Sequence, residues 1–246
     1  MKNKNTIGPS IHNVEPFFIS QFYQNSNKSI LYIGKDEREI SSMEQKIKWL
    51  LPDVEILLFK SWDQIPYDNV SPSKEVQIER LKTLKILSNS NAKRIILTTI
   101  NSITQKIIPR WIINSQFLKI SKKQKFKLED LINNLVLLGF QRTSLVRDKS
   151  EFSVRGSILD IFPNDRSKPI RIDFFDEEIE TIFEFDPITQ KRLKEINSDL
   201  EFNIINELIL NENNLNLFRK NFREIFPEYR NSQVYNLFSE NIIPSG

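Results

Sequence analysis

Cysteine is absent from the 246-residue sequence, and histidine occurs once. Without cysteine the chain can form no disulfide, no thiolate metal site and no cysteine nucleophile; this fits a reducing compartment, so we expect the protein in the cytoplasm. The single histidine, His12, has no serine or acidic partner spaced for a catalytic triad or a metal site. A surface or loop position is therefore expected for it, and no metal site is expected.

Long apolar runs are also missing. No segment approaches the roughly 18 uninterrupted apolar residues that indicate a membrane-spanning helix. The first residues, MKNKNTIGPSIHNVEPFF, lack the continuous apolar stretch of a signal peptide. The sequence therefore predicts no membrane association, and its 39% hydrophobic and 27% charged residues are typical of a globular protein.

Charge is small in sum, with a formal net value of +3, but it is unevenly distributed. Residues 119–127 (KISKKQKFK) contain five lysines, and residues 173–186 contain seven acidic residues. The lysine run could attract the phosphates of DNA, although such a run is more often a solvated linker or an edge strand. The acidic segment could suggest a magnesium-dependent nuclease. Its alternation with Ile179, Phe183 and Phe185 favours instead a strand with an acidic outer face.

Residues 28–118 have the pattern of an α/β unit. Short β-rich runs at 29–34, 55–60 and 94–99 alternate with helical stretches, which predicts a parallel sheet with crossover helices. The first helix is expected over 36–51, where apolar residues recur at helical spacing.

Further helices are predicted from capping residues and apolar stripes. One follows the segment SPSKEV, with Ser71 as its N-cap and Pro72 as its first residue. Another is expected over 127–138, with Gly139 as its C-terminal stop. The last forty-odd residues also return to a helical pattern.

Between these helical segments the apolar period changes from 3.6 to 2. We expect three antiparallel strands there, at 151–162, 169–176 and 178–186. The segment PNDRSK forms the first connection, and FDEE forms a tighter second turn.

The α/β unit lacks a phosphate-binding loop of the Walker A type. Such a loop needs G-x-x-x-x-G-K-[ST], in which backbone N–H groups wrap the phosphates and the hydroxyl holds magnesium. The one Gly-Lys pair, Gly34-Lys35, is followed by Asp36, and Ser29 stands where the first glycine would be. An aspartate there would repel phosphate, so we expect no nucleotide cofactor and no catalytic residue in this chain.

The alternating segment contains an unusual second face. Apolar residues share one side of the predicted strands, namely Phe152, Val154, Ile158, Ile170, Ile172 and Phe174. The opposite side presents Arg155, Arg171, Asp173 and Phe175. Arginine and aromatic residues are enriched at the energetic centres of protein–protein interfaces, which favours a partner-binding surface. Two alternatives stay open: the face packs against helix 127–138, or its charges only pair across strands.

Three stretches resemble a known family. Residues 151–193 (EFSVRGSILDIFP…PIRIDFFDEEIETIFEFDPITQKRL) are similar to a signature shared by the excision-repair protein UvrB and the N-terminal module of bacterial transcription-repair coupling factors. Residues 61–84 (SWDQIPYDNVSPSKEVQIERLKTL) and 218–246 resemble segments of the coupling factors. UvrB has an intact Walker A motif and a long Tyr-rich hairpin, and this sequence has neither. The resemblance is therefore to the coupling factors.

This resemblance implies a fold and a domain organisation. The fold class is α/β, with a parallel-sheet, helicase-like domain (degenerate P-loop) and an inserted, β-rich antiparallel domain that binds UvrA. The implied boundaries are 1–118 for the first part of the helicase-like domain, 119–200 for the UvrA-binding domain and 201–246 for a helical segment that returns to the first domain.

The resemblance also implies a function and a partner. The inserted domain would recruit UvrA to RNA polymerase stalled at DNA damage, with Arg155, Arg171, Asp173 and Phe175 at matching positions carrying the contact. Full-length members of the family are ATP-dependent DNA translocases, and contacts with RNA polymerase and DNA would lie in regions absent here. The chain would then be a non-catalytic fragment.

Two alternatives from other classes stay open. One is a UvrB-type ATP-dependent helicase or excision-repair subunit, which predicts magnesium-dependent nucleotide binding. The other is a DNA-binding module that uses the lysine run 119–127, which predicts binding that weakens steeply with salt.

Overall fold

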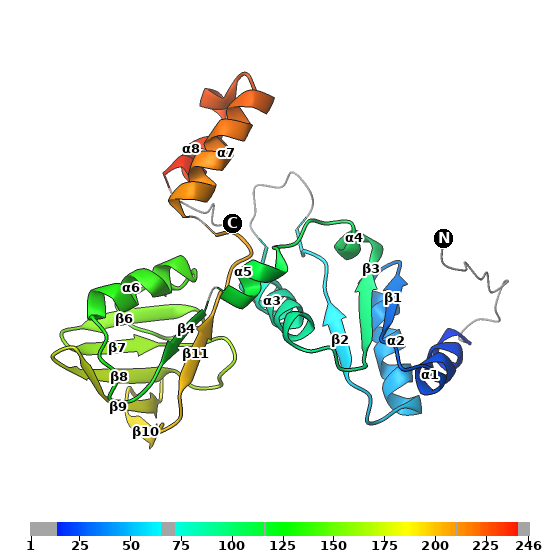
Figure 1. Cartoon of the computed structure of the whole chain (residues 1–246), viewed down its shortest axis with the longest axis horizontal. Helices are drawn as coiled ribbons and strands as arrows, with labels where there is room; N and C mark the ends of the chain where they lie inside the picture. Colours follow the sequence, from blue (N-terminus) through cyan, green and yellow to red (C-terminus); the bar gives the residue numbers. More distant parts are fainter. Residues whose placement is uncertain (1–13, 65–71, 116, 210, 241–246) are drawn as a thin grey trace. The chain divides into compact units, whose positions relative to one another are not determined.

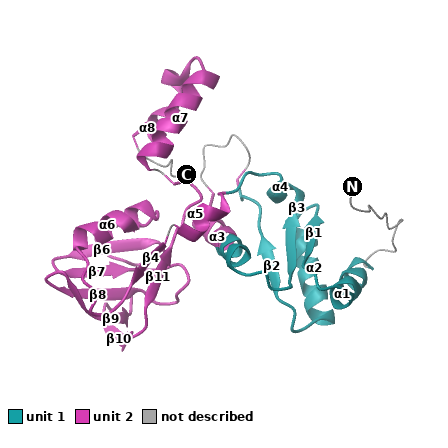
Figure 2. Cartoon of the chain, viewed as in Figure 1, with its two compact units in different colours: residues 1–63, 82–107 teal, residues 64–81, 108–246 magenta. Residues whose placement is uncertain are grey.

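The computed structural model describes residues 14–64, 72–115, 117–209 and 211–240 (Figure 1). The chain divides into two compact units: residues 1–63 with 82–107, and residues 64–81 with 108–246 (Figure 2). His12 and Ser71, which carried two predictions, lie outside the described residues. Among the helices that the structure describes, none is both long enough and apolar enough to cross a bilayer.

The first unit is built on a three-stranded parallel sheet in the order β1-β3-β2. These strands cover Ile30–Gly34 (β1), Ile56–Phe59 (β2) and Ile95–Thr99 (β3), which confirms the predicted strands and their parallel arrangement. The helices of this unit are α1 (Glu15–Asn25), α2 (Glu37–Leu50), α4 (Ile100–Ile103) and the second half of α3 (Lys74–Asn89).

Helix α2 packs on this sheet through an apolar stripe at helical spacing. Ile40, Met43 and Ile47 are buried and join Ile95 and Leu97 of β3 in one hydrophobic cluster. The helix begins where predicted, because the side chain of the N-cap Asp36 accepts a hydrogen bond from the Glu39 amide at 2.9 Å.

Helix α3 begins later than predicted. Its first residue is Lys74, and the hydroxyl of Ser73 accepts a hydrogen bond from the Val76 amide at 3.4 Å. Pro72 therefore precedes the helix instead of forming its first residue, because a serine nearer the apolar stripe supplies the side-chain oxygen.

The second unit is mainly antiparallel β-structure. Its six-stranded sheet has the order β10-β9-β8-β7-β6-β5, and a two-stranded sheet pairs β11 with β4. The strands are β4 (Phe117–Ile120), β5 (Gln141–Arg142), β6 (Glu151–Arg155), β7 (Ile158–Ile161), β8 (Ile170–Phe175), β9 (Glu178–Phe185), β10 (Arg192–Glu195) and β11 (Leu200–Asn203). The helices are the first half of α3, the short α5 (Arg110–Ser115), α6 (Leu128–Leu137), α7 (Glu212–Ile225) and α8 (Gln233–Ser239).

One face of the six-stranded sheet is covered by α6, which lies beside the sheet in Figure 1. The buried side chains of Leu131 and Leu135 join the sheet residues that alternate on that face, including Phe152 and Ile172. The helix ends as predicted: Gly139 has φ +96°, and its amide donates to the Val136 carbonyl at 2.9 Å. This face is the core face of the sheet.

The predicted single strand over 151–162 is wrong. The chain reverses at Gly156-Ser157, so that β6 and β7 form a hairpin in which Arg155 lies opposite Ile158. Gly156 has φ +59°, a left-handed conformation that glycine adopts without strain. Because the hairpin restarts the alternation, Ile158 shares the face of Arg155 and not, as predicted, that of Phe152.

The predicted acidic outer face of β9 is also wrong. The pairing of β8 with β9 shifts register between Asp173 and Phe174, so that Ile179 lies opposite Phe174 on the core face. Beyond the shift, Phe183 lies opposite Arg171 on the other face. The acidic residues of β9 are consequently divided between both faces of the sheet.

The last described residues form a helical hairpin with its own aromatic cluster. It comprises α7 (Glu212–Ile225), a 3₁₀ turn (Tyr229–Asn231) and α8 (Gln233–Ser239), which confirms the predicted helical pattern. The rings of Phe218 and Tyr235 stack with centroids 6.1 Å apart, and Phe222 lies 5.4 Å from Tyr235. The return of residues 201–246 to the first domain stays a prediction.

Candidate partner-binding face

The four residues predicted to bind a partner lie on the sheet face opposite α6. Strand alternation and register place Arg155, Arg171 and Asp173 there, with Phe175 at the end of β8. We call this surface the arginine face and define it by Arg155, Asp160, Arg171, Asp173 and Phe175. The alternative that this face packs against helix 127–138 is wrong, because the buried side chains of α6 join the core face.

Asp160 of β7 lies at the centre of the arginine face and is only 1% exposed. Its Oδ1 accepts a hydrogen bond from Nε of Arg171 at 2.6 Å, and its Oδ2 accepts one from Nη2 of the same arginine at 2.9 Å. The same Oδ2 also accepts a hydrogen bond from Nη2 of Arg155 at 2.6 Å. One buried carboxylate therefore binds two guanidinium groups from the strands on either side of it.

Arg171 is held from its other side by the turn that follows β9. Its Nη2 donates to Oε1 of Gln190 at 2.9 Å, and its Nη1 lies 3.4 Å from the Gln190 carbonyl oxygen. Its guanidinium also lies over the ring of Phe185, 4.6 Å from the centroid. The hydrogen bond to Asp160 raises the pKa of Arg171 above its ordinary value, so this side chain is always charged.

The turn that supplies Gln190 is stabilised by Asp186. Its Oδ1 accepts hydrogen bonds from the amides of Ile188 at 3.0 Å and Thr189 at 2.8 Å. The Thr189 amide, followed by that of Ile188, lowers the pKa of Asp186. Gln190 itself has φ +60°, which is uncommon for a residue other than glycine. The turn therefore has the local geometry needed to present Gln190 to Arg171.

Asp173 forms a second charged pair on the arginine face. Its Oδ2 accepts hydrogen bonds from Oγ1 of Thr181 at 2.8 Å and from Nη2 of Arg192 at 2.9 Å. Arg192 also lies over the ring of Phe183, 3.9 Å from the centroid. Oδ1 of Asp173 is buried and has no hydrogen-bond partner among the described residues. Arg155, Arg171 and Asp173 thus do pair across strands, and the alternative that they only do so stays open beside partner binding.

Exposure divides the predicted residues into two groups. Phe175 is 73% exposed, and the side chain of Arg155 is 47% exposed. The side chains of Arg171 and Asp173 are only 12% and 16% exposed. Phe175 and Arg155 can meet a partner directly, whereas Arg171 and Asp173 mainly contact residues of the sheet and its turns.

Sequence reasoning missed three residues of this surface: Asp160, Gln190 and Arg192. Asp160 was missed because residues 151–162 were interpreted as one strand, although the Arg-Gly-Ser segment is a hairpin signal that could have placed it. No local pattern identifies Gln190 or Arg192, since their contacts depend on how β10 follows β9.

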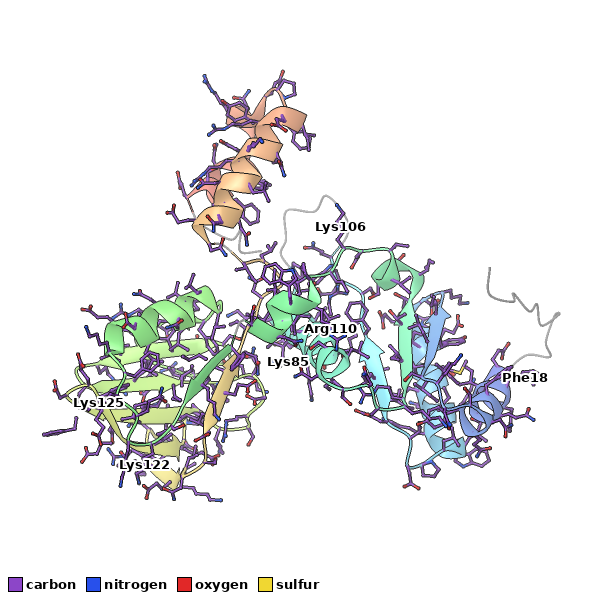
Figure 3. The ribbon with its side chains drawn as sticks, in the orientation of Figure 1. Phe18, Lys85, Lys106, Arg110, Lys122 and Lys125 are labelled. Carbon is purple, nitrogen blue, oxygen red and sulfur yellow. The ribbon has the colours of Figure 1, made fainter. Side chains whose placement is uncertain are left out.

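The lysine run forms part of a strand and a turn. Nζ of Lys119 pairs with Oδ2 of Asp199 at 2.8 Å, and Nζ of Lys122 pairs with Oε1 of Glu195 at 2.5 Å. The hydrogen bond to Asp199 raises the pKa of Lys119 and lowers that of Asp199. Figure 3 shows Lys122 and Lys125 at the periphery of the β-rich part of the chain. These acidic partners reduce the positive potential that the run could offer to a nucleic acid.

The edge of the parallel sheet where nucleotides commonly bind has two carboxylates and one guanidinium in its lining. The cavity there, of about 420 Å³, is lined by Asp36, Glu37, Arg38, Ser61, Thr99 and Asn101. Glu37 accepts hydrogen bonds from the amide and hydroxyl of Ser61 at 3.1 and 2.7 Å. At the start of α2 the carboxylate of Asp36 already accepts a hydrogen bond from the Glu39 amide, a donor that a bound phosphate would need. Within the described ranges, no group of three or more His, Cys, Asp or Glu side chains is placed to hold a metal ion.

Part of the chain matches a known protein family. Residues 118–201, which contain the whole arginine face, match the protein family described as the UvrB interaction domain. The β-rich part of the chain is therefore similar to UvrB interaction domains.

Over most of its length the chain is also similar to transcription-repair-coupling factors. It is 29% identical to that of Haemophilus influenzae over 98% of this chain and 21% of the relative. The identity is 32% with that of Rickettsia conorii, over 85% of this chain and 19% of the relative, and 27% with that of Escherichia coli, over 79% and 17%. The chain thus spans about a fifth of the length of these relatives.

Proposed function

We propose that the arginine face binds UvrA, and that the chain acts in transcription-coupled repair by recruiting UvrA to stalled RNA polymerase. One observation carries the proposal: within the residues that match the UvrB interaction domain, Phe175 is 73% exposed on the sheet face that α6 leaves uncovered. A large aromatic side chain held on a rigid strand is an effective anchor, because its burial against a partner costs little conformational entropy.

Arg155 supplies the polar component of the proposed contact. From strand spacing and register, its backbone lies roughly 12 Å from that of Phe175, close enough for both side chains to enter one interface. Its guanidinium is half exposed and can donate charge-assisted hydrogen bonds to carboxylates of the partner. An apolar anchor beside a charged donor would give both affinity and orientation.

The proposal assigns recruitment, and no catalytic step or cofactor, to these residues. It is supported by the similarity to coupling factors and by the carboxylates at the sheet edge, which disfavour phosphate. ATP-dependent translocation and contacts with RNA polymerase and DNA are assigned to other regions of the longer relatives. The proposed location is the cytoplasm, where these partners occur.

A titration of the chain with purified UvrA tests the proposal. We expect Phe175→Ala and Arg155→Ala each to weaken binding by roughly tenfold or more, which is the effect of removing an interface hot spot. Two control variants match them in residue type. Phe22→Ala removes a phenylalanine that is 59% exposed on α1, and Arg142→Ala removes an exposed arginine on β5 of the same sheet.

The test is the difference in UvrA affinity between the two test variants and the two control variants. If Phe175→Ala and Arg155→Ala bind UvrA as tightly as the unchanged chain, the proposed site is wrong. Equal weakening by all four variants would indicate a non-specific effect. A chain that binds DNA with a steep salt dependence, or ATP with magnesium, would favour the alternatives based on the lysine run or on a UvrB-type helicase.

A further inference from the structure

We infer that the two arginines of the arginine face have different roles and that Asp160 is the positioning residue that separates them. Arg155 presents free donors to the partner, whereas Arg171 fixes the carboxylate that orients Arg155. This inference rests on the proposed function and deepens it, because it separates the roles of two arginines that the sequence places on the same face.

The hydrogen bonds of Arg171 are almost all satisfied within the domain. A guanidinium has five N–H donors, one on Nε and two on each terminal nitrogen. The Nε donor and one Nη2 donor bind Asp160, while the second Nη2 donor and one Nη1 donor are directed at Gln190. At most one N–H of Arg171 is left for a partner, and the side chain is only 12% exposed.

In contrast, most N–H donors of Arg155 are not used within the domain. Its one hydrogen bond runs from Nη2 to Oδ2 of Asp160, and no other partner of its guanidinium occurs among the described residues. Four of its five N–H donors are therefore available, on a side chain that is 47% exposed. A single contact with Asp160 limits the rotamers of Arg155 and leaves one of the two bidentate edges of its guanidinium available.

Asp160 connects the two arginines, because it binds both of them. It is buried between them on β7, so its charge offsets the repulsion between two like charges on β6 and β8. Gln190 and Phe185 immobilise Arg171, Arg171 orients the carboxylate with a two-point contact, and the carboxylate holds Arg155. A pre-ordered Arg155 loses less side-chain entropy when a partner binds.

A double-mutant cycle with purified UvrA tests this role. Asp160→Asn keeps the shape of the side chain and removes its charge, and we expect it to weaken UvrA binding about tenfold, comparable with the loss of one charge-assisted hydrogen bond. In the Arg155→Ala background the same change should have almost no further effect, because Asp160 acts through Arg155. In the Phe175→Ala background it should again weaken binding about tenfold.

Purely structural damage would produce a different pattern. If Asp160→Asn only loosened the fold, its effect would be the same in both backgrounds, and this additivity would overturn the inference. Asp165→Asn, at an exposed position of the turn before β8, is the matched control and should leave the affinity unchanged. Unchanged UvrA affinity in Asp160→Asn, together with weak binding by Arg155→Ala and Phe175→Ala, would also reject the inference while leaving the proposed function intact. If neither Arg155→Ala nor Phe175→Ala weakened binding, the proposed function itself would be wrong.

A second measurement requires neither the partner nor a change at Asp160. In a ¹⁵N NMR spectrum of the unchanged chain, the Nε–H of Arg171 should exchange slowly with water, because it donates to a buried carboxylate. The Nε–H of Arg155 should exchange much faster, and Arg155→Lys and Arg171→Lys assign the two signals. Equal protection of both groups would overturn the division of roles, whatever the binding data show.

Discussion

Arg171 and Asp160 form a two-point ion pair across neighbouring strands, with Nε–Oδ1 at 2.6 Å and Nη2–Oδ2 at 2.9 Å. The carboxylate is buried, and its second arginine, Arg155, binds the same Oδ2 at 2.6 Å. This cluster therefore stabilises the domain. It also lies on the face of the six-stranded sheet that is the candidate binding surface.

Removing the carboxylate should therefore destabilise the domain. We expect Asp160→Ala to lower the free energy of unfolding by on the order of 3–5 kcal/mol, because it leaves Arg171 charged and almost buried without its main partner. Urea denaturation followed by circular dichroism measures the change. Asp165→Ala, at an exposed position, should shift the free energy by less than about 0.5 kcal/mol.

A second buried ion pair is expected to show non-additive behaviour. Nε of Arg80 lies 2.7 Å from Oε1 of Glu207, and the two side chains are 0% and 8% exposed. Glu207→Ala should cost about 3–5 kcal/mol of unfolding free energy, because a buried guanidinium loses its carboxylate. The double variant Arg80→Met/Glu207→Leu should be close to the unchanged chain in stability, since apolar side chains of similar size need no partner. Equal losses in the single and double variants, measured by urea denaturation, would contradict this.

The turn after β9 should make stability depend on acidic pH. The folded-state pKa of Asp186 is lowered from 3.8 by the amides of Thr189 and Ile188, with a smaller contribution from Lys168. A lowered folded-state pKa stabilises the protein above the unfolded-state value, and this contribution is lost as pH falls through the folded-state pKa.

Unfolding free energies measured between about pH 5 and pH 2 test this expectation. Asp186→Asn can still accept the turn hydrogen bonds but does not titrate, so its stability should fall less steeply as the solution is acidified. Asp199→Asn removes a second carboxyl whose pKa is lowered, and it should flatten the curve separately. An unchanged slope in Asp186→Asn would show that this turn does not contribute.

The two left-handed glycines of the second unit should respond differently to alanine. Gly156 has φ +59°, and a Cβ added there would meet no atom within 4 Å, so Gly156→Ala should cost only backbone strain of about 1–2 kcal/mol. Gly139 has φ +96°, and a Cβ there would lie 3.1 Å from Cγ1 of Ile205 and 3.3 Å from Cβ of Asn206. Gly139→Ala should therefore be the more destabilising variant in thermal unfolding. The reverse order would show that crowding at Gly139 is relieved without cost.

The local sequence pattern is sufficient to predict several elements of the fold. The period of 2 in IRIDFF predicts correctly that Arg171, Asp173 and Phe175 alternate with buried apolar residues, because side chains of a strand point to opposite faces. The stripe of α6, its Gly139 stop and the parallel strands β1 to β3 also follow from local periodicity and capping.

The same local pattern fails where the chain changes direction or register. Periodicity assigns Ile158 to the wrong face because the Gly156-Ser157 hairpin restarts the alternation. It assigns Phe183 and Ile179 to one face, but the bulge in the β8–β9 pairing separates them. Both errors arise because register depends on the neighbouring strand as well as on the strand's own residues.

The amino-acid sequence by itself determined which residue types occupy which strands. It thereby also determined the fold class of the domain that these strands form. Only the tertiary structure decided that Phe175 and Arg155 are exposed while Arg171 is enclosed by Asp160 and Gln190. The physical reason is that alternation assigns a side chain to a face, whereas its exposure and its hydrogen-bond partners depend on residues brought to that face by other strands and turns.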